Sequence, residues 1–305
     1  MEAKVYQIFG PLPFPLLSIK LIFMDLSILH DPEAFRRRVI SALARDPVDF
    51  LEQLDFIHEQ KNQAPWEGAG VILPIFFEKK GKEGAGEYVF LLNKRSRTIR
   101  QGGDLCAPGG GVHPFLDGVL EKLLLFGLLP WARGPASDLA RQKGKPVYEK
   151  ILFFLGNALR ESWEEIRLKP SNVEFLGALP AYRLESRKWV IFPLVGRVKH
   201  DWKYKLSPEV DEIVYVPLHL FFQPERYALY SLEVPENLVA QGIPNPWEFP
   251  CLVYGEDEKE EILWGATFKI ILSFLRIVFD DPMPMPAGSR VIRKLLDASY
   301  LSGRK

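Results

Sequence analysis

The stretch Ala158-Leu159-Arg160-Glu161-Ser162-Trp163-Glu164-Glu165-Ile166 has the spacing of an amphipathic helix. At 3.6 residues per turn, Glu161, Glu164 and Glu165 stand at i, i+3 and i+4, so one helical face carries three carboxylates. Apolar side chains fall on the other side, where a core would lie: Leu159, Trp163 and Ile166. Neighbouring carboxylates repel one another, and oxygen ligands at this spacing can share a divalent cation such as Mg²⁺. The residues alone leave two interpretations open, a metal site and a solvated acidic face.

The composition excludes several classes of protein. The 305 residues are 47% hydrophobic, which is enough to bury a sizeable core in one large domain or one domain with extensions. Lysine plus arginine equals aspartate plus glutamate at 39 each, so no overall basic field indicates a nucleic-acid partner. Cys106 and Cys251 form no CxxC motif, which argues against a disulfide framework or a structural zinc site and predicts a reducing, cytoplasmic location. The histidines are scattered, so any metal is expected to have oxygen ligands.

The first residues give no sign of a signal peptide or a membrane anchor. The apolar segment from Val5 to Leu29 is interrupted by three prolines, Lys20 and Asp25. No segment reaches the roughly 18–20 uninterrupted apolar residues that a membrane span requires. We therefore expect a soluble chain with no membrane partner.

The order of elements predicts an α/β (α+β) fold, an α/β/α sandwich around a mixed sheet. Residues 1–65 are expected to form an N-terminal extension that is partly helical, with helices from Asp31 to about Ala44 and from Pro47 to about Glu59. Residues 66–280 form the main domain, and residues 281–305 a tail with a short helix over about 289–299. Alternating apolar residues predict strands over 70–78, 87–93, 173–179, 188–198, 212–217, 249–254 and 261–264. A helix begins at Pro146 and ends by Lys169-Pro170, and another covers 265–279.

Residues 118–145 differ from everything around them. Their first half, Gly118 to Trp131, is strongly apolar but too short to span a bilayer, and their second half is polar. We interpret 118–145 as an insertion whose apolar part is a buried helix, an oligomer contact or a lid, with packing in the interior favoured.

Two glycine-rich segments precede this insertion. Lys94 to Asp104 combines arginines with glycines, and Cys106 to Gly111 ends in three consecutive glycines. Glycine lets the backbone approach a ligand closely, although a glycine triplet on its own is more often a tight turn.

Together these residues resemble the Nudix hydrolase family. Its sequence box is a glycine, a glutamate six positions later and, after seven more residues, Arg-Glu-hydrophobic-x-Glu-Glu-x-Gly-hydrophobic. Arg160 to Leu168 reproduces the second half, and Pro108-Gly109-Gly110 reproduces the entry turn. Within the family the chain is most similar to the coenzyme A pyrophosphatase branch, through Leu91-Leu92-Asn93-Lys94-Arg95-Ser96, Arg100 and Gly103. The likeness covers about residues 70–279, including Phe192 to Gly196, Pro208 to Ile213 and Ile262 to Thr267.

The resemblance implies roles for particular residues. The Mg²⁺ (or Mn²⁺) ligands would be the three helix glutamates and a backbone carbonyl: Glu161, Glu164, Glu165 and Gly110. Arg160 would hold the glutamates in place, and Glu209 would lie near the metals. The substrate would be bound by Arg95, Arg100, Gly109 and Gly110, since a guanidinium fork suits diphosphate oxygens. For the two arginines a solvated loop is the alternative.

The resemblance also has departures. Leu116 stands where the box has its first glutamate, with Asp117 next, and the spacer before Arg160 is longer by roughly 35 residues. Arg167 replaces the box glycine. The resemblance implies a Mg²⁺-dependent hydrolase of a nucleoside diphosphate derivative, with coenzyme A or a derivative as the first substrate to test and with a homodimer among the expected assemblies. The alternative is a catalytically degenerate Nudix-fold module that binds nucleotides or proteins.

Overall fold

Strand β1 (Glu67–Lys79) is the axis of the main sheet. It runs antiparallel to β2 (Gly86–Arg95), antiparallel to the short β4 (Gly109–Gly111) and parallel to β7 (Trp189–Val198). In this computed structural model the described residues are 26–62, 65–79, 86–240, 242–255, 260–280, 290–297 and 300. The sheet is completed by strands on either side of this centre, β3 (Leu105–Cys106) and β8 (Val210–Pro217) next to β2, and β5 (Val173–Ala178) and β6 (Tyr182–Leu184) next to β7. The predicted mixed sheet is confirmed.

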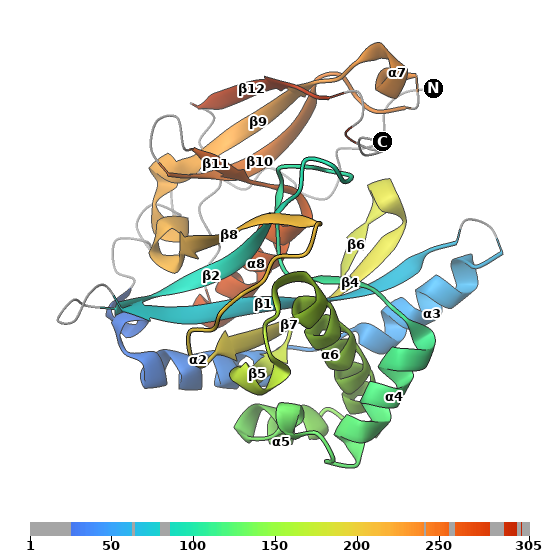
Figure 1. The fold of residues 1–305 in the computed structure, drawn as a ribbon, viewed down its shortest axis with the longest axis vertical. Helices are drawn as coiled ribbons and strands as arrows, with labels where there is room; N and C mark the ends of the chain where they lie inside the picture. Colours follow the sequence, from blue (N-terminus) through green and yellow to red (C-terminus); the bar gives the residue numbers. More distant parts are fainter. Residues whose placement is uncertain are drawn as a thin grey trace.

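The two faces of β1 are covered by different helices. The N–H of Gly70 donates to Asn157 of α6 (Lys145–Ile166). Ile75 pairs with Phe90 on β2, and the Phe90 ring contacts Phe274 of α8 (Gly265–Phe279). Because successive side chains of a strand point to opposite faces, residues 70 and 75 face opposite sides, so α6 and α8 enclose the sheet as an α/β/α sandwich (Figure 1). This is the predicted architecture.

The N-terminal helices contribute to the same core. After the 3₁₀ turn η1 (Leu26–His30), helix α2 (Pro32–Arg45) begins at Asp31, whose side chain accepts hydrogen bonds from two backbone N–H groups. Phe35 of α2 and Phe50 of α3 (Phe50–Gln60) are fully buried in the main hydrophobic cluster. The predicted helix over 47–59 begins at Phe50 instead, because Asp49 is the N-cap residue and its carboxylate accepts from the Ala181 N–H. Residues 1–25 of the expected extension lie outside the described residues.

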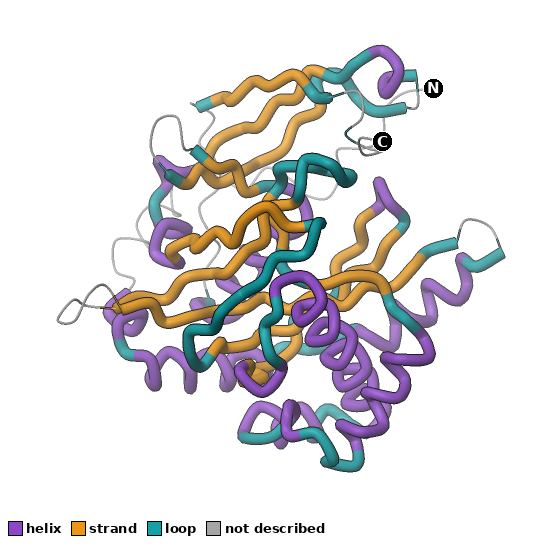
Figure 2. Tube along the Cα trace, in the orientation of Figure 1, coloured by secondary structure: helices purple, strands orange, loops and turns teal. Residues whose placement is uncertain are grey.

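The inserted residues fold as helices against α6. They form α4 (Pro114–Leu125), the turn η2 (Pro130–Ala132) and α5 (Pro135–Arg141) before α6 begins at Lys145 (Figure 2). Helix α4 buries Leu124, but its Val119 is exposed, and so are Phe126 and Leu128 directly after the helix, with 73% of Phe126 accessible. The favoured interpretation of a buried apolar helix is therefore only half right. The apolar residues outnumber the positions that one face of α4 can bury.

A second sheet lies beside the first and was not predicted. Its order is β11 (Glu261–Leu263), β10 (Trp247–Tyr254), β9 (Tyr227–Glu233) and β12 (Val291–Leu295). The hairpin of β10 and β11 was predicted, whereas the helix expected over 289–299 is wrong, because Val291 to Leu295 pairs in parallel with β9. The β-branched Val291 and Ile292 suit that pairing. Residues 281–289, 298–299 and 301–305 of the tail lie outside the described residues.

Short elements connect the strands of the two sheets. They are the 3₁₀ turns η3 (Pro170–Asn172), η4 (Glu185–Arg187), η5 (Leu218–Phe222) and η6 (Pro224–Arg226) and the one-turn helix α7 (Glu236–Val239). Across the described ranges, none of the helices combines the length and the apolar character needed to cross a bilayer.

Candidate active site

Helix α6 carries the three glutamates of the predicted site. Its buried face includes Ile151, Leu155 and Leu159, which fix the rotation of the helix against the sheet. Helix α6 ends at Ile166, and Arg167 caps it in the left-handed conformation at φ 56°. Trp163, expected on the core side, is instead 37% exposed, and the Arg167 guanidinium lies 5.1 Å from its ring centroid.

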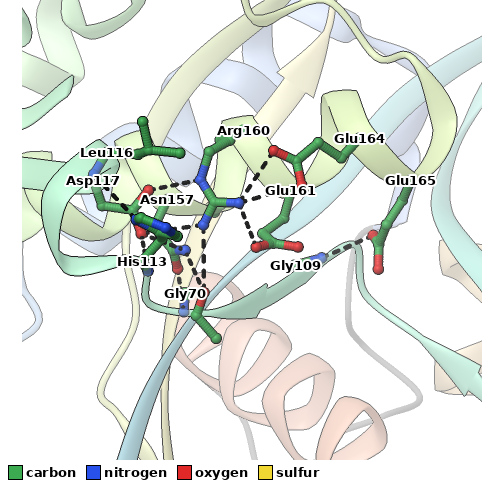
Figure 3. A network of polar contacts seen from close by, with 12 residues as sticks. Gly70, Gly109, His113, Leu116, Asp117, Asn157, Arg160, Glu161, Glu164 and Glu165 are labelled. Carbon is green, nitrogen blue, oxygen red and sulfur yellow. Dashed lines mark hydrogen bonds and ion pairs between the residues drawn. The ribbon is translucent and has the colours of Figure 1, made fainter. Parts of the chain in front are cut away.

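Arg160 is the centre of the polar network on this helix (Figure 3). Its Nε donates to Asp117 Oδ1 at 2.8 Å, and its Nη1 lies 2.7 Å from Glu161 Oε1 and 3.2 Å from Glu164 Oε1. Burial on its own lowers the pKa of the guanidinium, but the hydrogen bonds to Asp117 and the charge of Glu161 raise it above its ordinary value. Arg160 therefore orients two of the glutamates, as the resemblance implies.

Asp117 is a residue of the network that was not assigned a role from the sequence. Its side chain is completely buried, and besides Arg160 it accepts hydrogen bonds from the His113 N–H at 2.7 Å and from Asn157 Nδ2 at 3.0 Å. Leu116, which occupies the position of the first box glutamate, is 43% exposed. The carboxylate thus lies one residue later than in the family pattern. In the sequence, Asp117 could have been found as an acidic residue next to the position of the first box glutamate.

Asn157 joins the helix to the strands beneath it. Its Oδ1 accepts from the Gly70 N–H of β1 at 2.7 Å, and its Nδ2 donates to the Gly111 carbonyl of β4 at 3.0 Å. Because the side chain is fully buried, these bonds satisfy both ends of an amide that would otherwise destabilise the interior. They position β4, and with it the glycine turn, directly against α6.

Gly110 lies against Glu161. A Cβ added to Gly110 would be 2.6 Å from Glu161 Oε2, so no larger residue fits there without displacing the carboxylate. Burial raises the pKa of Glu161, while Arg160 acts to lower it. The structure therefore brings Gly110 and Glu161 together, two of the residues predicted as metal ligands.

Glu165 is the most deeply buried carboxyl group of the three. Its Oε2 accepts from the Gly109 N–H at 3.1 Å and from Asn93 Nδ2 at 3.0 Å. The pKa of Glu165 is raised to about 8, chiefly by burial and also by the charges of Glu161 and Glu209, although the Gly109 hydrogen bond and Arg95 act to lower it. Asn93 Oδ1 is also buried here, and the described residues give it no hydrogen-bond donor. This end of the site has an excess of acceptor oxygens, which a cation would satisfy.

The remaining predicted residues come from two loops that meet. The Ser96 N–H donates to the Glu209 carbonyl at 2.9 Å, which places Glu209 beside the arginine-rich loop. Arg95 Nε donates to the Arg100 carbonyl at 3.0 Å. Arg95 and Glu209 both influence the pKa of Glu165, so both lie near its carboxyl group. Arg100 is exposed.

The donor set suits a hard divalent cation, because it consists of carboxylate and carbonyl oxygens. In the part of the chain that the structure describes, no three acidic, histidine or cysteine side chains already converge as a metal cluster. The physical reason is that Arg160 draws Glu161 and Glu164 toward itself, whereas Glu165 points to Gly109 (Figure 3). The glutamate side chains must therefore rotate to bind a cation, while helix α6 itself stays fixed.

Comparison with known proteins gives matches to Nudix hydrolases. No protein-family model matches the chain. It is 28% identical over 126 residues to the uncharacterized Nudix hydrolase NudL of Pectobacterium atrosepticum, covering 41% of this chain and 59% of that protein. It is 26% identical over 127 residues to the peroxisomal coenzyme A diphosphatase NUDT7 of Mus musculus, covering 41% of this chain and 50% of that protein. The match thus spans only half to three fifths of these relatives.

Comparison with solved structures gives weak matches. A C. elegans Ap4A hydrolase in a binary complex is 15% identical, with a TM-score of 0.31, over 50% of this chain and 81% of that one. A MutT/nudix family protein from Enterococcus faecalis is 12% identical, with a TM-score of 0.36, over 87% of this chain and 76% of that one. The sequence matches agree with the resemblance seen in the motifs, because the chain is similar to proteins named as a Nudix hydrolase and as a coenzyme A diphosphatase.

Proposed function

We propose that the chain is a metal-dependent hydrolase that cleaves the diphosphate linkage of a nucleoside diphosphate derivative, with coenzyme A or a derivative as the first substrate to test. The observation that carries the proposal is the buried, partly uncompensated carboxyl group of Glu165, with Glu161 and Glu164 on the same helix face. The name of NUDT7, a coenzyme A diphosphatase, supports the choice of substrate.

The cation would be held by Glu161, Glu164 and Glu165, with the Gly110 carbonyl as a further ligand. Mg²⁺ or Mn²⁺ bound there supplies charge neutralisation at the diphosphate oxygens and lowers the pKa of a bound water. Glu209, whose charge acts on Glu165, would orient an attacking water.

The chain's own residues position both reactants. Arg160, tied to the buried Asp117, sets the orientation of Glu161 and Glu164. Arg95 and Arg100 bind diphosphate oxygens, where the planar fork of a guanidinium gives paired hydrogen bonds. The absence of a side chain at Gly109 and Gly110 lets their backbone lie directly against β1 and Glu161, which would bring the Gly110 carbonyl to the cation and the substrate. These groups lower the barrier chiefly by orientation and electrostatic stabilisation.

A non-catalytic binding module is the second candidate. The observation that favours it is that Arg160 already pairs with two of the three glutamates. Asp117 opposes it, because a buried carboxylate bonded to Arg160 supplies the charge that the missing box glutamate would bring. A reducing compartment such as the cytoplasm suits either candidate, since Cys106 and Cys251 are both free thiols.

One experiment separates the two candidates. Product release is measured from coenzyme A, NADH, ADP-ribose, diadenosine polyphosphates and nucleoside triphosphates, with Mg²⁺ and with EDTA. The proposal predicts metal-dependent cleavage of at least one diphosphate compound. A folded protein that cleaves none of them with Mg²⁺, but binds one, is a binding module.

A further inference from the structure

Asn93 of β2 bonds directly to a predicted metal ligand, and no role was assigned to it from the sequence. Its Nδ2 donates to Glu165 Oε2 at 3.0 Å, and the residue is almost completely buried. Its strand is held from both sides, because Asn93 pairs with Cys106 on β3 and with Ile213 on β8. The carboxamide therefore meets the end of α6 from a fixed position in the main sheet.

The second donor to the same oxygen is also held by the sheet. The Gly109 N–H of β4 donates to Glu165 Oε2 at 3.1 Å. Gly109 lies directly against β1, since a Cβ added to it would be 2.4 Å from the Gly70 carbonyl oxygen and 2.6 Å from Val71 Cα. Strands β2 and β4 thus hold one carboxylate oxygen of Glu165 between them.

The other carboxylate oxygen of Glu165, Oε1, has a different environment. The hydrogen bonds among the described residues include none to Oε1. Within the same ranges Asn93 Oδ1 is the one fully buried side-chain oxygen or nitrogen without a partner, so Oε1 must be accessible to solvent. The rotation that brings the three glutamates together then falls chiefly on Glu161 and Glu164, which Arg160 holds in the absence of a cation.

The opposite end of the Asn93 carboxamide indicates that stability is not the reason for an amide at this position. Oδ1 is buried and receives no hydrogen bond from the described residues. A buried acceptor without a donor destabilises the folded state. Leucine has nearly the same shape without polar atoms, so it would avoid this cost. What a leucine would lack is the Nδ2 donor to Glu165.

We propose that Asn93 is a positioning residue that makes Glu165 a single-oxygen ligand and thereby favours Mg²⁺ or Mn²⁺ over Ca²⁺. Because two donors already occupy Oε2, Oε1 is left for a cation. Single carboxylate oxygens suit the near-octahedral geometry that Mg²⁺ requires, whereas Ca²⁺ accepts a larger and more flexible set and often takes both oxygens of one carboxylate. This inference rests on the proposed function for the presence of a cation at the α6 carboxylates.

The test measures the ratio of the Ca²⁺ and Mn²⁺ dissociation constants of the full chain without substrate, so its result does not depend on hydrolysis. Electron paramagnetic resonance follows Mn²⁺ binding and the displacement of Mn²⁺ by Ca²⁺. The variants are Asn93→Leu, which removes both polar atoms, and Asn93→Asp, which replaces the donor by an oxygen. The matched control is Asn172→Leu, because the Asn172 carboxamide is bonded at both ends to the His200 backbone, at 2.6 Å through Nδ2 and 3.1 Å through Oδ1.

The proposal predicts that Asn93→Leu lowers the ratio of the Ca²⁺ Kd to the Mn²⁺ Kd by about tenfold, because Glu165 can then bind a cation with both oxygens. Its Tm should rise or stay within about 2 °C of the wild type, since the variant loses an unpartnered buried acceptor together with one hydrogen bond. Asn93→Asp should lower the ratio at least as much, because the added carboxylate is a further Ca²⁺ ligand. Asn172→Leu should show the reverse pattern, a lower Tm with the wild-type ratio.

The outcomes separate this inference from the proposed function. If the wild type binds Mn²⁺ and both folded Asn93 variants keep its ratio, Asn93 is a structural residue and the inference is overturned, while the metal site stands. A wild type that binds no Mn²⁺ overturns both the inference and the metal-dependent hydrolase. A wild type that binds Mn²⁺ but cleaves no diphosphate contradicts only the hydrolase, and the ratio still decides the role of Asn93.

Discussion

The two halves of the candidate site differ in how their charges are balanced. On helix α6, every carboxylate has a partner within the chain: Arg160 for Glu161 and Glu164, and the Gly109 N–H and Asn93 amide for Glu165. In the basic half, formed by Arg95 and Arg100, the ion pairs found among the described residues join neither arginine to a carboxylate. The acidic half is thus organised in advance by the protein, whereas the basic half lacks an anion.

The fold itself supplies the charge balance of the acidic half, whereas a ligand would have to supply the charge balance of the basic half. Asp117, Asn157 and Arg160 form a buried network that fixes the acidic half even though its negative charges repel. In the basic half, Arg95 at the end of β2 donates its Nε to the Arg100 carbonyl of the following loop, so a backbone group rather than a carboxylate orients this guanidinium. Binding of a charged ligand is therefore expected to change the charge balance of the basic half more than that of the acidic half.

Removing a carboxylate from the acidic half gives the largest expected effect. Glu165→Gln or Glu164→Gln should reduce kcat/KM by about 10³-fold or more, equivalent to roughly 4 kcal/mol of transition-state stabilisation, because the amide is a poor ligand for a hard cation. Steady-state hydrolysis measures the loss. Glu149→Gln, on the same helix but more than three turns away, is the control and should keep wild-type activity. Full activity in Glu164→Gln and Glu165→Gln would remove the metal assignment.

Breaking the network under the acidic half should cost stability as well as activity. Asp117→Ala removes a buried carboxylate that accepts from Arg160 and Asn157, both of which keep other partners, so the free energy of unfolding should fall by about 1.5–3 kcal/mol in urea titrations. The neighbouring Leu116→Ala is the control, with an expected loss below about 1 kcal/mol because Leu116 is 43% exposed.

Restoring the family pattern should not rescue this variant. Leu116→Glu added to Asp117→Ala places the carboxylate about 100° around α4 from the position of Asp117. Recovery of wild-type stability in that double variant would mean that Asp117 is not the residue that holds Arg160.

The raised pKa of Glu165 predicts a pH dependence of the metal-free protein. A proton binds this carboxyl group more tightly in the folded chain, with a pKa of about 8, than in the unfolded chain, where the value is 4.5. Stability from this group is therefore present at low pH and is lost as pH rises toward 8. Between pH 6.5 and 8, above the pKa of about 6 of Asp104, the Tm in EDTA should fall in the wild type. The slope should be smaller in Glu165→Gln, and parallel slopes in the two proteins would contradict the assignment.

The smallest effect is expected at the end of α6. Arg167 adopts φ 56°, a conformation that costs a non-glycine residue roughly 1–2 kcal/mol, and its stacking on Trp163 returns about 0.5–1 kcal/mol. Arg167→Gly should therefore raise the free energy of unfolding by about 0.5–1 kcal/mol without changing activity. Arg167→Ala loses the stacking and keeps the strain, so it should be less stable than the wild type. A glycine variant as unstable as the alanine variant would show that backbone strain is not the dominant effect.

The acidic half was largely predictable from the sequence, because its three glutamates lie close together in the chain. The i, i+3, i+4 spacing of Glu161, Glu164 and Glu165 follows from helical geometry. Periodic apolar residues likewise predicted β1, β2, β7 and α8, whose buried faces are continuous in sequence.

The remaining features depend on contacts between distant segments. Asp117 is 43 positions from Arg160, and the inserted helices between them hide the pairing that the usual spacing would indicate. β12 is a strand only because β9 offers it a free edge. Such tertiary contacts override local propensity, which explains why the expected helix over 289–299 is wrong.

The most direct test of the central claim, that the α6 carboxylates hold a catalytic cation, is Mn²⁺ binding measured by electron paramagnetic resonance. The wild type should bind Mn²⁺, and the Glu161→Gln/Glu165→Gln double variant should bind it with a Kd raised by about 100-fold or more. Equal Mn²⁺ affinity in the two proteins, with both of them folded, would contradict the claim.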